Sequence, residues 1–257
     1  MTAAAVLGCH AGTPARELRV CSDPNNLPFS NQRQEGFENR LAALISQELK
    51  AKLEYTWWAE RRGFLRNTLN AGRCDLVMGM PPGVGGVITT RPYYRSTYVF
   101  VWRRDRHLDI KSLDDPRLRT LKIGVQLIGD DYANTQPVHA LSRRGIVQNI
   151  VGYRIVGDYS EANPPARIID AVTDGQVDVA VAWGPLAGFF AKKSRVPLET
   201  SPVLPAFDPP GLQFVFDIAL AVRRDEQGLA RELDEVLVRR KPAIDSILTE
   251  YGVPRTP

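Results

Sequence analysis

The sequence predicts an α/β protein built from two lobes, each a mostly parallel sheet flanked by helices. The first observation is the length, because 257 residues suit either one large α/β unit or two lobes of roughly 100 to 130 residues. The second is a regular alternation of strand-like and helix-like segments, which favours parallel sheets. The third is that the alternation restarts midway along the chain, which indicates two similar units.

The first unit has the order β-α-β-α-β. Short apolar runs bounded by turn residues predict its strands, and an apolar stripe at helical spacing predicts its main helix. A second helix ends at Ala71-Gly72, where glycine suits the last turn. The predicted strands cover residues 18–21, 53–58 and 74–80, and the predicted helices cover 37–49 and 64–69.

The second unit follows an aromatic strand at residues 98–102. One of its helices begins at Asn163-Pro164-Pro165, with a cap residue and a proline in the first turn, and ends at Gly175. A long amphipathic helix over 229–248, kinked at Pro242, is expected to pack back on the first lobe. The other predicted elements are strands at 121–125, 153–156, 177–182 and 214–222 and a helix at 130–144.

Composition and motif content exclude several classes of function. The net charge is +4, and the basic pairs are scattered rather than gathered on one stripe, which disfavours nucleic-acid binding. The richest apolar stretch contains Pro185 and two glycines, so no segment is long enough to span a membrane. Three cysteines and three histidines form no metal motif, and no nucleophile lies beside a base. We therefore expect no metal, no cofactor and no enzymatic activity.

The amino terminus is typical of an exported protein. Residues 1–8 are small and apolar like the end of a secretory signal, so we expect residues 1–16 to be a signal remnant or a disordered arm. Val6-Leu7-Gly8-Cys9 also has the order of a lipoprotein cleavage site, which would place a lipid on Cys9. The interpretation favoured over this anchor is a cysteine inside a discarded signal peptide. Either way, the periplasm is the expected location.

A lobe that is interrupted by a second lobe and completed by a C-terminal helix resembles the layout of type II periplasmic solute-binding proteins. The similarity spans about residues 18–254 and implies that 17–101 plus 215–257 form lobe one and 102–214 form lobe two. The motifs that carry it occur in the family's order: Asp23 with Pro28-Phe29-Ser30, Gly36-Phe37-Glu38, Arg91-Pro92-Tyr93-Tyr94 and Tyr251-Gly252-Val253-Pro254.

Longer motifs resemble one subfamily, the quinoprotein-dehydrogenase-associated MxaJ/XoxJ proteins that are encoded beside methanol dehydrogenases. The matching stretches are residues 21–31 (CSDPNNLPFSN), 61–64 (RRGF), 89–96 (TTRPYYRS), 163–167 (NPPAR) and 183–188 (WGPLAG). The resemblance implies a periplasmic accessory protein that binds and activates or matures a methanol dehydrogenase dependent on pyrroloquinoline quinone (PQQ). The dehydrogenase, with its cytochrome c as a further candidate, is then the expected partner. The calcium and the lanthanide forms of the enzyme both stay open.

The alternative function is a receptor that delivers a small solute to an ABC importer. Amino-acid receptors of the superfamily hold the ligand ammonium with an acid after a lobe-two strand, and Trp183 occupies that position here. An ammonium buried without its carboxylate is unfavourable. We therefore expect that common amino acids and small polyamines do not bind.

The resemblance also suggests where a partner docks. We expect an apolar cleft lined by Trp58, Tyr94, Trp183 and Phe189, suited to a peptide segment or an apolar ligand. A polar rim would steer an acidic partner. Each of these residues also has a structural interpretation, as core aromatics, solvated arginines or turn-shaping Asx residues. The rim and loop candidates are Arg61, Arg62, Arg95, Asp23, Asn25 and Phe29.

We predict a disulfide between Cys21 and Cys74. The first and third strands are neighbours in the sheet order that the resemblance implies, and export places the chain in an oxidising compartment. The bond would close a loop of some fifty residues, which the chain-entropy treatment values at up to ~4 kcal/mol.

Overall fold

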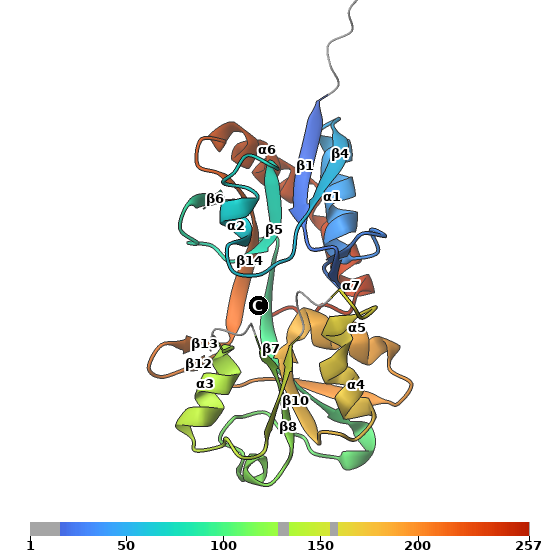
Figure 1. The fold of residues 1–257 in the computed structure, drawn as a ribbon, viewed down its shortest axis with the longest axis vertical. Coiled ribbons are helices and arrows are strands. Elements are labelled where there is room, and N and C mark those ends of the chain that lie inside the picture. Colours follow the sequence, from blue (N-terminus) through green and yellow to red (C-terminus); the bar gives the residue numbers. More distant parts are fainter. Residues whose placement is uncertain (1–15, 128–133, 155–158, 257) are drawn as a thin grey trace, which may run out of the picture.

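The computed structural model describes residues 16–127, 134–154 and 159–256. It contains two lobes, one above the other in Figure 1, that share one path of hydrogen-bonded strands in the order β4-β1-β5-β14-β7-β10-β8-β9. Within the lobes the pairs β1 with β4 and β5, and β8 with β9 and β10, are parallel. The predicted two-lobe α/β fold is confirmed.

Lobe one is formed by both ends of the chain. Its strands are β1 (Glu17–Ser22), β4 (Lys52–Trp57), β5 (Leu76–Met80), β6 (Val87–Thr89) and the small pair β2 (Asn25–Asn26) and β3 (Ser30–Asn31). Its helices are α1 (Phe37–Glu48), α2 (Phe64–Asn67), α6 (Gln227–Arg239) and α7 (Lys241–Glu250). One apolar core joins β1, β5, α1, α6 and α7.

Lobe two is formed by the middle of the chain. Its strands are β8 (Ile123–Leu127), β9 (Ile150–Arg154), β10 (Val179–Trp183), β11 (Leu198–Pro202) and the pair β12 (Phe207–Asp208) and β13 (Leu212–Gln213). Its helices are α3 (Gln136–Arg143), α4 (Arg167–Thr173) and α5 (Gly184–Lys193), with 3-10 turns η1 (Arg104–Arg106), η2 (Pro116–Arg119) and η3 (Pro164–Ala166). Separate apolar clusters pack on the two faces of its sheet.

Two long strands connect the lobes. β7 (Tyr94–Arg103) and β14 (Val215–Arg223) run from one lobe to the other and pair with each other over Tyr94–Thr97. Tyr94 packs in the core of lobe one, whereas Tyr98 packs in the core of lobe two. The chain therefore passes from one core to the other between these two residues.

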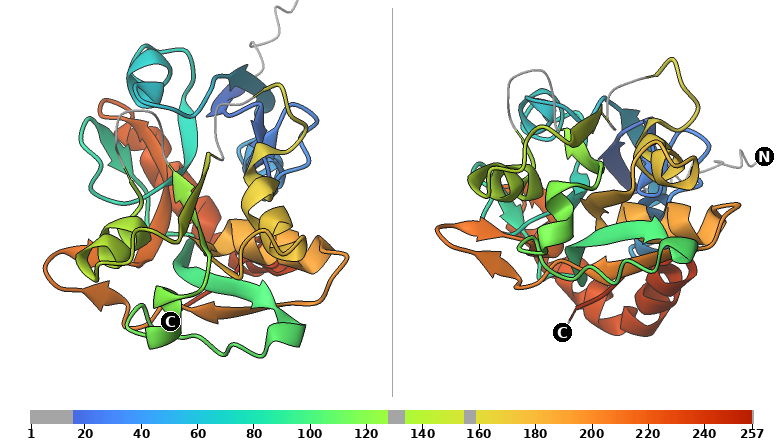
Figure 2. Two further views of the ribbon diagram at one scale, coloured as in Figure 1. Left: turned by 60° about the horizontal axis from the view of Figure 1, so that its bottom comes forward. Right: turned by 90° about the horizontal axis from the view of Figure 1, so that it is seen from below.

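The C-terminal helix differs from its prediction. Instead of one helix kinked at Pro242, α6 ends at Arg239 and α7 begins at Lys241, with Arg240 outside regular helical geometry at φ −101°. Proline in the first turn of a new helix leaves no donor unpaired, so it starts α7 rather than bending a continuous helix. Both helices pack against α1 of lobe one, as expected; they are drawn in red tones in Figure 2.

Most predicted elements lie where expected, with shifted ends. β7 is longer than the predicted strand, and α3 begins only at Gln136. The start of the predicted helix at 130–133 and the end of the predicted strand at 155–156 lie outside the described residues, as do the signal remnant and Cys9. In the described part of the chain, no helix is both long and apolar enough to span a membrane.

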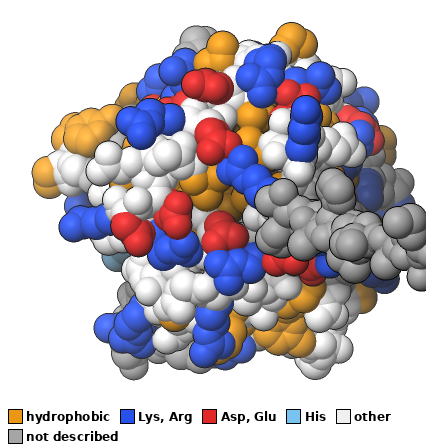
Figure 3. Space-filling model, turned by 90° about the horizontal axis from the view of Figure 1, so that it is seen from above, with side chains coloured by type: hydrophobic (Ala, Val, Ile, Leu, Met, Phe, Trp, Pro, Cys, Tyr) orange, Lys and Arg blue, Asp and Glu red, His pale blue; other side chains and the backbone are white. Residues whose placement is uncertain are grey.

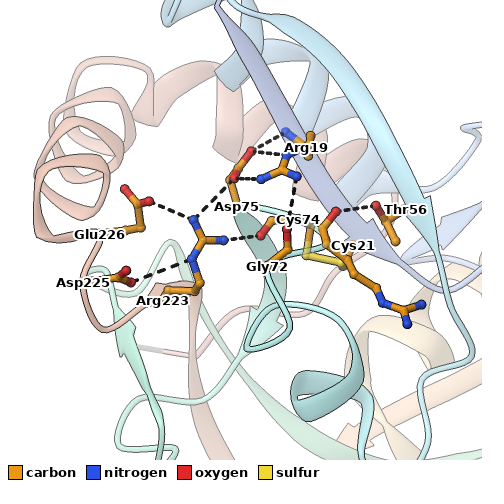
Figure 4. Close-up of polar contacts among 10 residues, drawn as sticks. Arg19, Cys21, Thr56, Gly72, Cys74, Asp75, Arg223, Asp225 and Glu226 are labelled. Carbon is orange, nitrogen blue, oxygen red and sulfur yellow. Dashed lines mark hydrogen bonds and ion pairs between the residues drawn. A yellow bond between two sulfur atoms is a disulfide. The ribbon is translucent and has the colours of Figure 1, made fainter.

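The predicted disulfide is present and links β1 to the segment that precedes β5. The Cα atoms of Cys21 and Cys74 are 5.6 Å apart. Asp75, the next residue, accepts hydrogen bonds from the Arg19 backbone and guanidinium, and Arg223 of β14 lies 3.7 Å from the same carboxylate (Figure 4). Covalent and ionic links thus hold three strands of lobe one together at this edge.

The surface carries charges of both signs. Figure 3 shows Lys and Arg side chains interspersed with Asp and Glu across one end of the molecule, with apolar side chains between them. No stripe of one sign is visible on this face, which agrees with the scattered basic pairs of the sequence.

Candidate functional site

A cavity of about 340 Å³ lies between the lobes. Both lobes contribute to its wall, so its shape depends on how the lobes are placed relative to each other. Among the residues that the structure describes, lobe one provides an acidic half and lobe two a half without charged side chains, with the crossing strands at the base of the cavity. The described residues that line it are Asn26, Phe29, Glu38, Glu60, Gly79, Tyr94, Tyr98, Gln126, Leu127, Thr135, Trp183 and Ile218.

Glu38 enters the cavity from the first turn of α1. The helix start is fixed because the Phe37 and Glu38 amides donate to backbone carbonyls of the preceding loop, at 2.8 and 3.0 Å. Gly79 of β5 lies against the carboxyl group, and a Cβ there would come within 2.6 Å of Glu38 Oε1. A side chain at this position would have to displace the Glu38 carboxyl group, and the φ of +74° also disfavours residues other than glycine.

The Glu38 carboxyl group is held in its protonated form near neutral pH. Only 8% of the residue is exposed, and this burial, with Glu60 nearby as a second cause, raises its pKa to about 8. The nearby Tyr93 hydroxyl offsets part of this rise in the pKa of Glu38. In the structure, this hydroxyl makes no hydrogen bond of normal geometry with a described residue.

Glu60 lies at the opening of the cavity and belongs to a network with Asn26 and Asp23. The Asn26 side-chain amide donates to Glu60 Oε2 at 3.0 Å, and the Glu60 backbone amide donates to Asp23 Oδ2 at 2.7 Å. Desolvation, and then Asp23, raise the pKa of Glu60. More than a third of its surface stays exposed, so solvent limits this rise.

The lobe-two half of the cavity is aromatic and amide-rich. Trp183 contacts Tyr98 and Phe216 edge to face, with ring centroids 5.4 and 5.9 Å apart. The Trp183 backbone amide donates to the side chain of Gln126, a buried residue at the end of β8. These contacts fix the indole as one wall of the cavity.

A front strap and a back contact join the lobes on either side of the cavity. In the front strap, the Tyr159 hydroxyl of lobe two donates to Asp23 Oδ2 at 3.2 Å, and Asn25 Nδ2 donates to the Glu161 carbonyl at 2.8 Å. In the back contact, the Phe189 ring of α5 stacks on Tyr251 at 5.6 Å. The structure therefore has the lobes closed over the cavity.

Three predicted cleft residues meet at the cavity, namely Phe29, Tyr94 and Trp183. Asp23 and Asn25 lie beside it, in the front strap. Arg61 is exposed next to Glu60. Arg62 is exposed on the same loop.

Three other predicted residues lie elsewhere, which corrects the expected cleft lining. Trp58 packs beside the disulfide, with the Arg73 guanidinium 4.9 Å above its ring, because β4 ends on that side of the sheet. Phe189 is used in the back contact. Arg95 lies on β7 opposite Asp217 of β14, its Nε 3.8 Å from that carboxylate, at the outer face of the crossing strands.

Sequence reasoning missed the carboxyl groups of the site. Glu38 was part of a family motif and Glu60 precedes the arginine pair, yet neither was given a role. The expectation that common amino acids and small polyamines do not bind rests on Trp183, which stands at the position of the lobe-two acid. It stays a prediction, although Glu38 and Glu60 supply carboxyl groups from lobe one.

The described lining of the site offers groups suited to binding a ligand. Among the described residues, no group of three or more His, Cys, Asp or Glu side chains has metal-binding geometry. The polar lining consists of carboxyl, amide and hydroxyl groups, set against aromatic rings. Such a mixture is typical of a small-molecule site.

Comparison with known proteins gives consistent relatives. The chain is 33% identical to protein MoxJ of Methylorubrum extorquens over 95% of this chain and 83% of that protein. It is 28% identical to MoxJ of Paracoccus denitrificans over 99% of this chain and 95% of that protein. No family model matches the chain.

Solved structures agree with these relatives. MxaJ from Methylophaga aminisulfidivorans MPT has a TM-score of 0.81 at 28% identity, covering 93% of this chain and all of that one. The periplasmic binding protein XoxJ from Methylobacterium extorquens AM1 has a TM-score of 0.75 at 38% identity, covering 93% of this chain and 99% of that one. An ancestral cationic amino acid binding protein, at 22% identity and a TM-score of 0.69, shares the fold.

Proposed function

The chain belongs to the family of periplasmic binding proteins that contains MoxJ, MxaJ and XoxJ, and from this premise we propose that it is a periplasmic accessory protein of a PQQ-dependent methanol dehydrogenase. It binds the dehydrogenase and activates or matures it. The observation that carries the proposal is the similarity to MoxJ over 95% of the chain. A fold built for solutes does not require solute transport as the function.

The rim of the cavity supports a protein-binding role. Arg61 and Arg62 are exposed on the loop that also holds Glu60 and the front strap. Exposed arginines at a cleft opening attract an acidic surface and set its orientation. If the lobes open, Phe29, Tyr94 and Trp183 become an aromatic surface of the kind that dominates interface energetics.

The test is affinity capture of the full chain from the periplasm of a methanol-grown source strain. A quinoprotein dehydrogenase retained in stoichiometric amounts is the expected result. Retention of an importer permease and no quinoprotein would contradict the proposal.

Substitution then locates the interface. Trp183→Ala is expected to weaken binding of the dehydrogenase at least tenfold if the indole is an anchor. Trp57→Ala is the matched control, because Trp57 stacks on Tyr55 outside the cavity. Equal affinities for both variants, with circular dichroism confirming their fold, would exclude the cleft as the docking site.

The second candidate is a receptor for a small solute, and one observation favours it. The cavity is enclosed by both lobes and retains carboxyl and amide groups that face inward. The two functions are separated by the genes beside this one, since an importer's permease and ATPase would support the receptor, and a dehydrogenase with its cytochrome c would support the accessory role.

A further inference from the structure

We propose that the cavity binds a small organic ammonium compound, whose N–H groups bond to oxygens of Glu38, Glu60 and Asn26 and whose apolar body rests against the aromatic wall. This inference names a ligand class for the cavity described above. It needs the cavity to be a ligand site, as the second candidate function does, and it holds whether or not a dehydrogenase is the partner.

The first observation is an acceptor without a donor. Asn26 is 5% exposed and lines the cavity, and its Oδ1 atom has no hydrogen-bond partner among the described residues. Its Nδ2 atom is already used by Glu60. A buried carbonyl oxygen left unpaired is unfavourable, so a ligand N–H would satisfy it.

The second observation is that Glu38 also faces the cavity without a donor. The residue is more than nine-tenths buried, and no described residue donates a hydrogen bond of normal geometry to its carboxyl group. Together with Glu60, which accepts only from Asn26 among the described residues, it gives the acidic half of the cavity spare oxygen acceptors. Three separate segments of lobe one therefore present oxygens to one space.

The charge of the lining selects a cation. The described lining residues include two carboxyl groups and neither lysine nor arginine. An anion, or the carboxylate of an amino acid, would meet Glu38 and Glu60 with no positive charge among the described lining residues. The expected ligand is therefore an amine that lacks a carboxylate.

The wall and the volume define the rest of the ligand. Phe29, Tyr94, Tyr98 and Trp183 present rings to the same space, which suits a cation because ring faces attract positive charge. A cavity of about 340 Å³ is at the lower end of the size of ligand sites. A single ring or a short alkyl chain on the ammonium group matches it.

Proton release is the signature of this binding mode. In the protein alone Glu38 is protonated at neutral pH, and a bound cation would drive it to ionise. The titratable groups that interact with it are Glu60, Tyr55, Tyr93 and Tyr94, none of which is cationic. Affinity should therefore rise with pH up to about 8, by as much as about tenfold per unit.

The probe is benzylammonium chloride, titrated by calorimetry into the full chain at several pH values and in two buffers of different ionisation enthalpy. Expected results are saturable binding, release of up to one proton near pH 7 and no binding of benzyl alcohol, benzoate or phenylalanine. Absence of benzylammonium binding, or equal binding of benzyl alcohol, would overturn the proposal. Binding of Ca²⁺ or La³⁺ that raises the melting temperature and displaces benzylammonium would also overturn the proposal, because the site would then be a metal site.

Two variants place the ligand. Glu38→Gln has the shape of the protonated side chain and is expected to fold, to lower affinity about ten- to a hundredfold, and to abolish proton release. Glu35→Gln is the matched control, since Glu35 lies outside the lining and pairs with Arg33. Unchanged affinity in Glu38→Gln would overturn the assignment. Capture of the dehydrogenase in the same preparation tests the proposed function separately, so either result can fail alone.

Discussion

The two halves of the cavity differ in chemistry and in how they are held. The lobe-one half carries Glu38, on α1 against Gly79 of β5, and Glu60, on the loop after β4. The same lobe contains the disulfide and the Asp75 network. Among the described residues, the lobe-two half has no charged side chain and consists of Trp183, Gln126 and their neighbours. The difference teaches that the charged groups of the described lining belong to the lobe that holds the disulfide, whereas the other lobe supplies aromatic and amide groups.

Removing the Cys21–Cys74 disulfide should give the largest loss of stability. The double variant Cys21→Ala, Cys74→Ala is expected to lose about 2–5 kcal/mol of unfolding free energy, because the bond joins β1 to the segment before β5. Thermal unfolding under oxidising conditions, followed by tryptophan fluorescence, measures it. A wild-type protein that shows free thiols, or a double variant of unchanged stability, would contradict the role assigned to the bond.

Neutralising the acidic half should change the pH dependence of stability. The pKa of Glu38 is raised from its ordinary value of 4.5, which applies to the unfolded chain, to about 8 in the folded protein. At a pH between these two pKa values, unfolding releases a proton from Glu38. The free energy of unfolding therefore falls as the pH rises from 4.5 to about 8. The decrease is expected to be of the order of 2–4 kcal/mol.

Glu38→Gln should flatten this dependence, as urea unfolding at pH 5, 7 and 9 would reveal. Glu35→Gln should leave the decrease in place, because Asn31 and Arg33 lower the pKa of the exposed Glu35 carboxyl. Parallel pH curves for wild type and Glu38→Gln would show that another group is responsible.

Shifting one half against the other tests whether the cavity depends on the back contact. A Cβ on Gly188 would lie 2.0 Å from the Gly252 carbonyl oxygen, so Gly188→Ala must separate α5 from the C-terminal segment. We expect a loss of about 1–3 kcal/mol and a larger radius of gyration by X-ray scattering. Gly228→Ala, where a Cβ meets no atom within 4 Å, is the control. A compact Gly188→Ala protein of normal stability would rule out a tight back contact.

Loosening the front strap should give the smallest effect. Tyr159→Phe removes the hydroxyl that donates to Asp23. The free energy that favours the closed over the open arrangement of the lobes is expected to fall by about 0.5–1.5 kcal/mol. The expected readout is a small shift toward open conformers in the distance between spin labels on the two lobes. An unchanged distance distribution would mean that the back contact alone keeps the lobes closed.

The elements and the disulfide could be predicted because their signals are local or depend on strand order alone. Successive residues of a strand point to opposite faces, and Trp57 and Trp58 accordingly make separate contacts, with Tyr55 and with Arg73. That neither lines the cavity could not be predicted, because it depends on where β4 lies in the sheet.

The acidic half could not be predicted because each acid had an ordinary local explanation. Glu38 lies in the first turn of a helix, where an acidic side chain is favourable in any protein. Glu60 precedes two arginines and matches an exposed charged loop. Only the approach of Gly79, Asn26 and the second lobe turns these residues into a shared site.

The interrupted layout of lobe one also sets the order in which the protein can be completed during biosynthesis. Most of lobe two is continuous between β7 and β14, so its core can form while residues 215–257 are still absent from the emerging chain. Lobe one must wait for β14, α6 and α7, which supply much of its core. Domains tend to fold as units as the chain emerges. Lobe two is therefore completed first, and lobe one, which carries Glu38 and Glu60, is completed last.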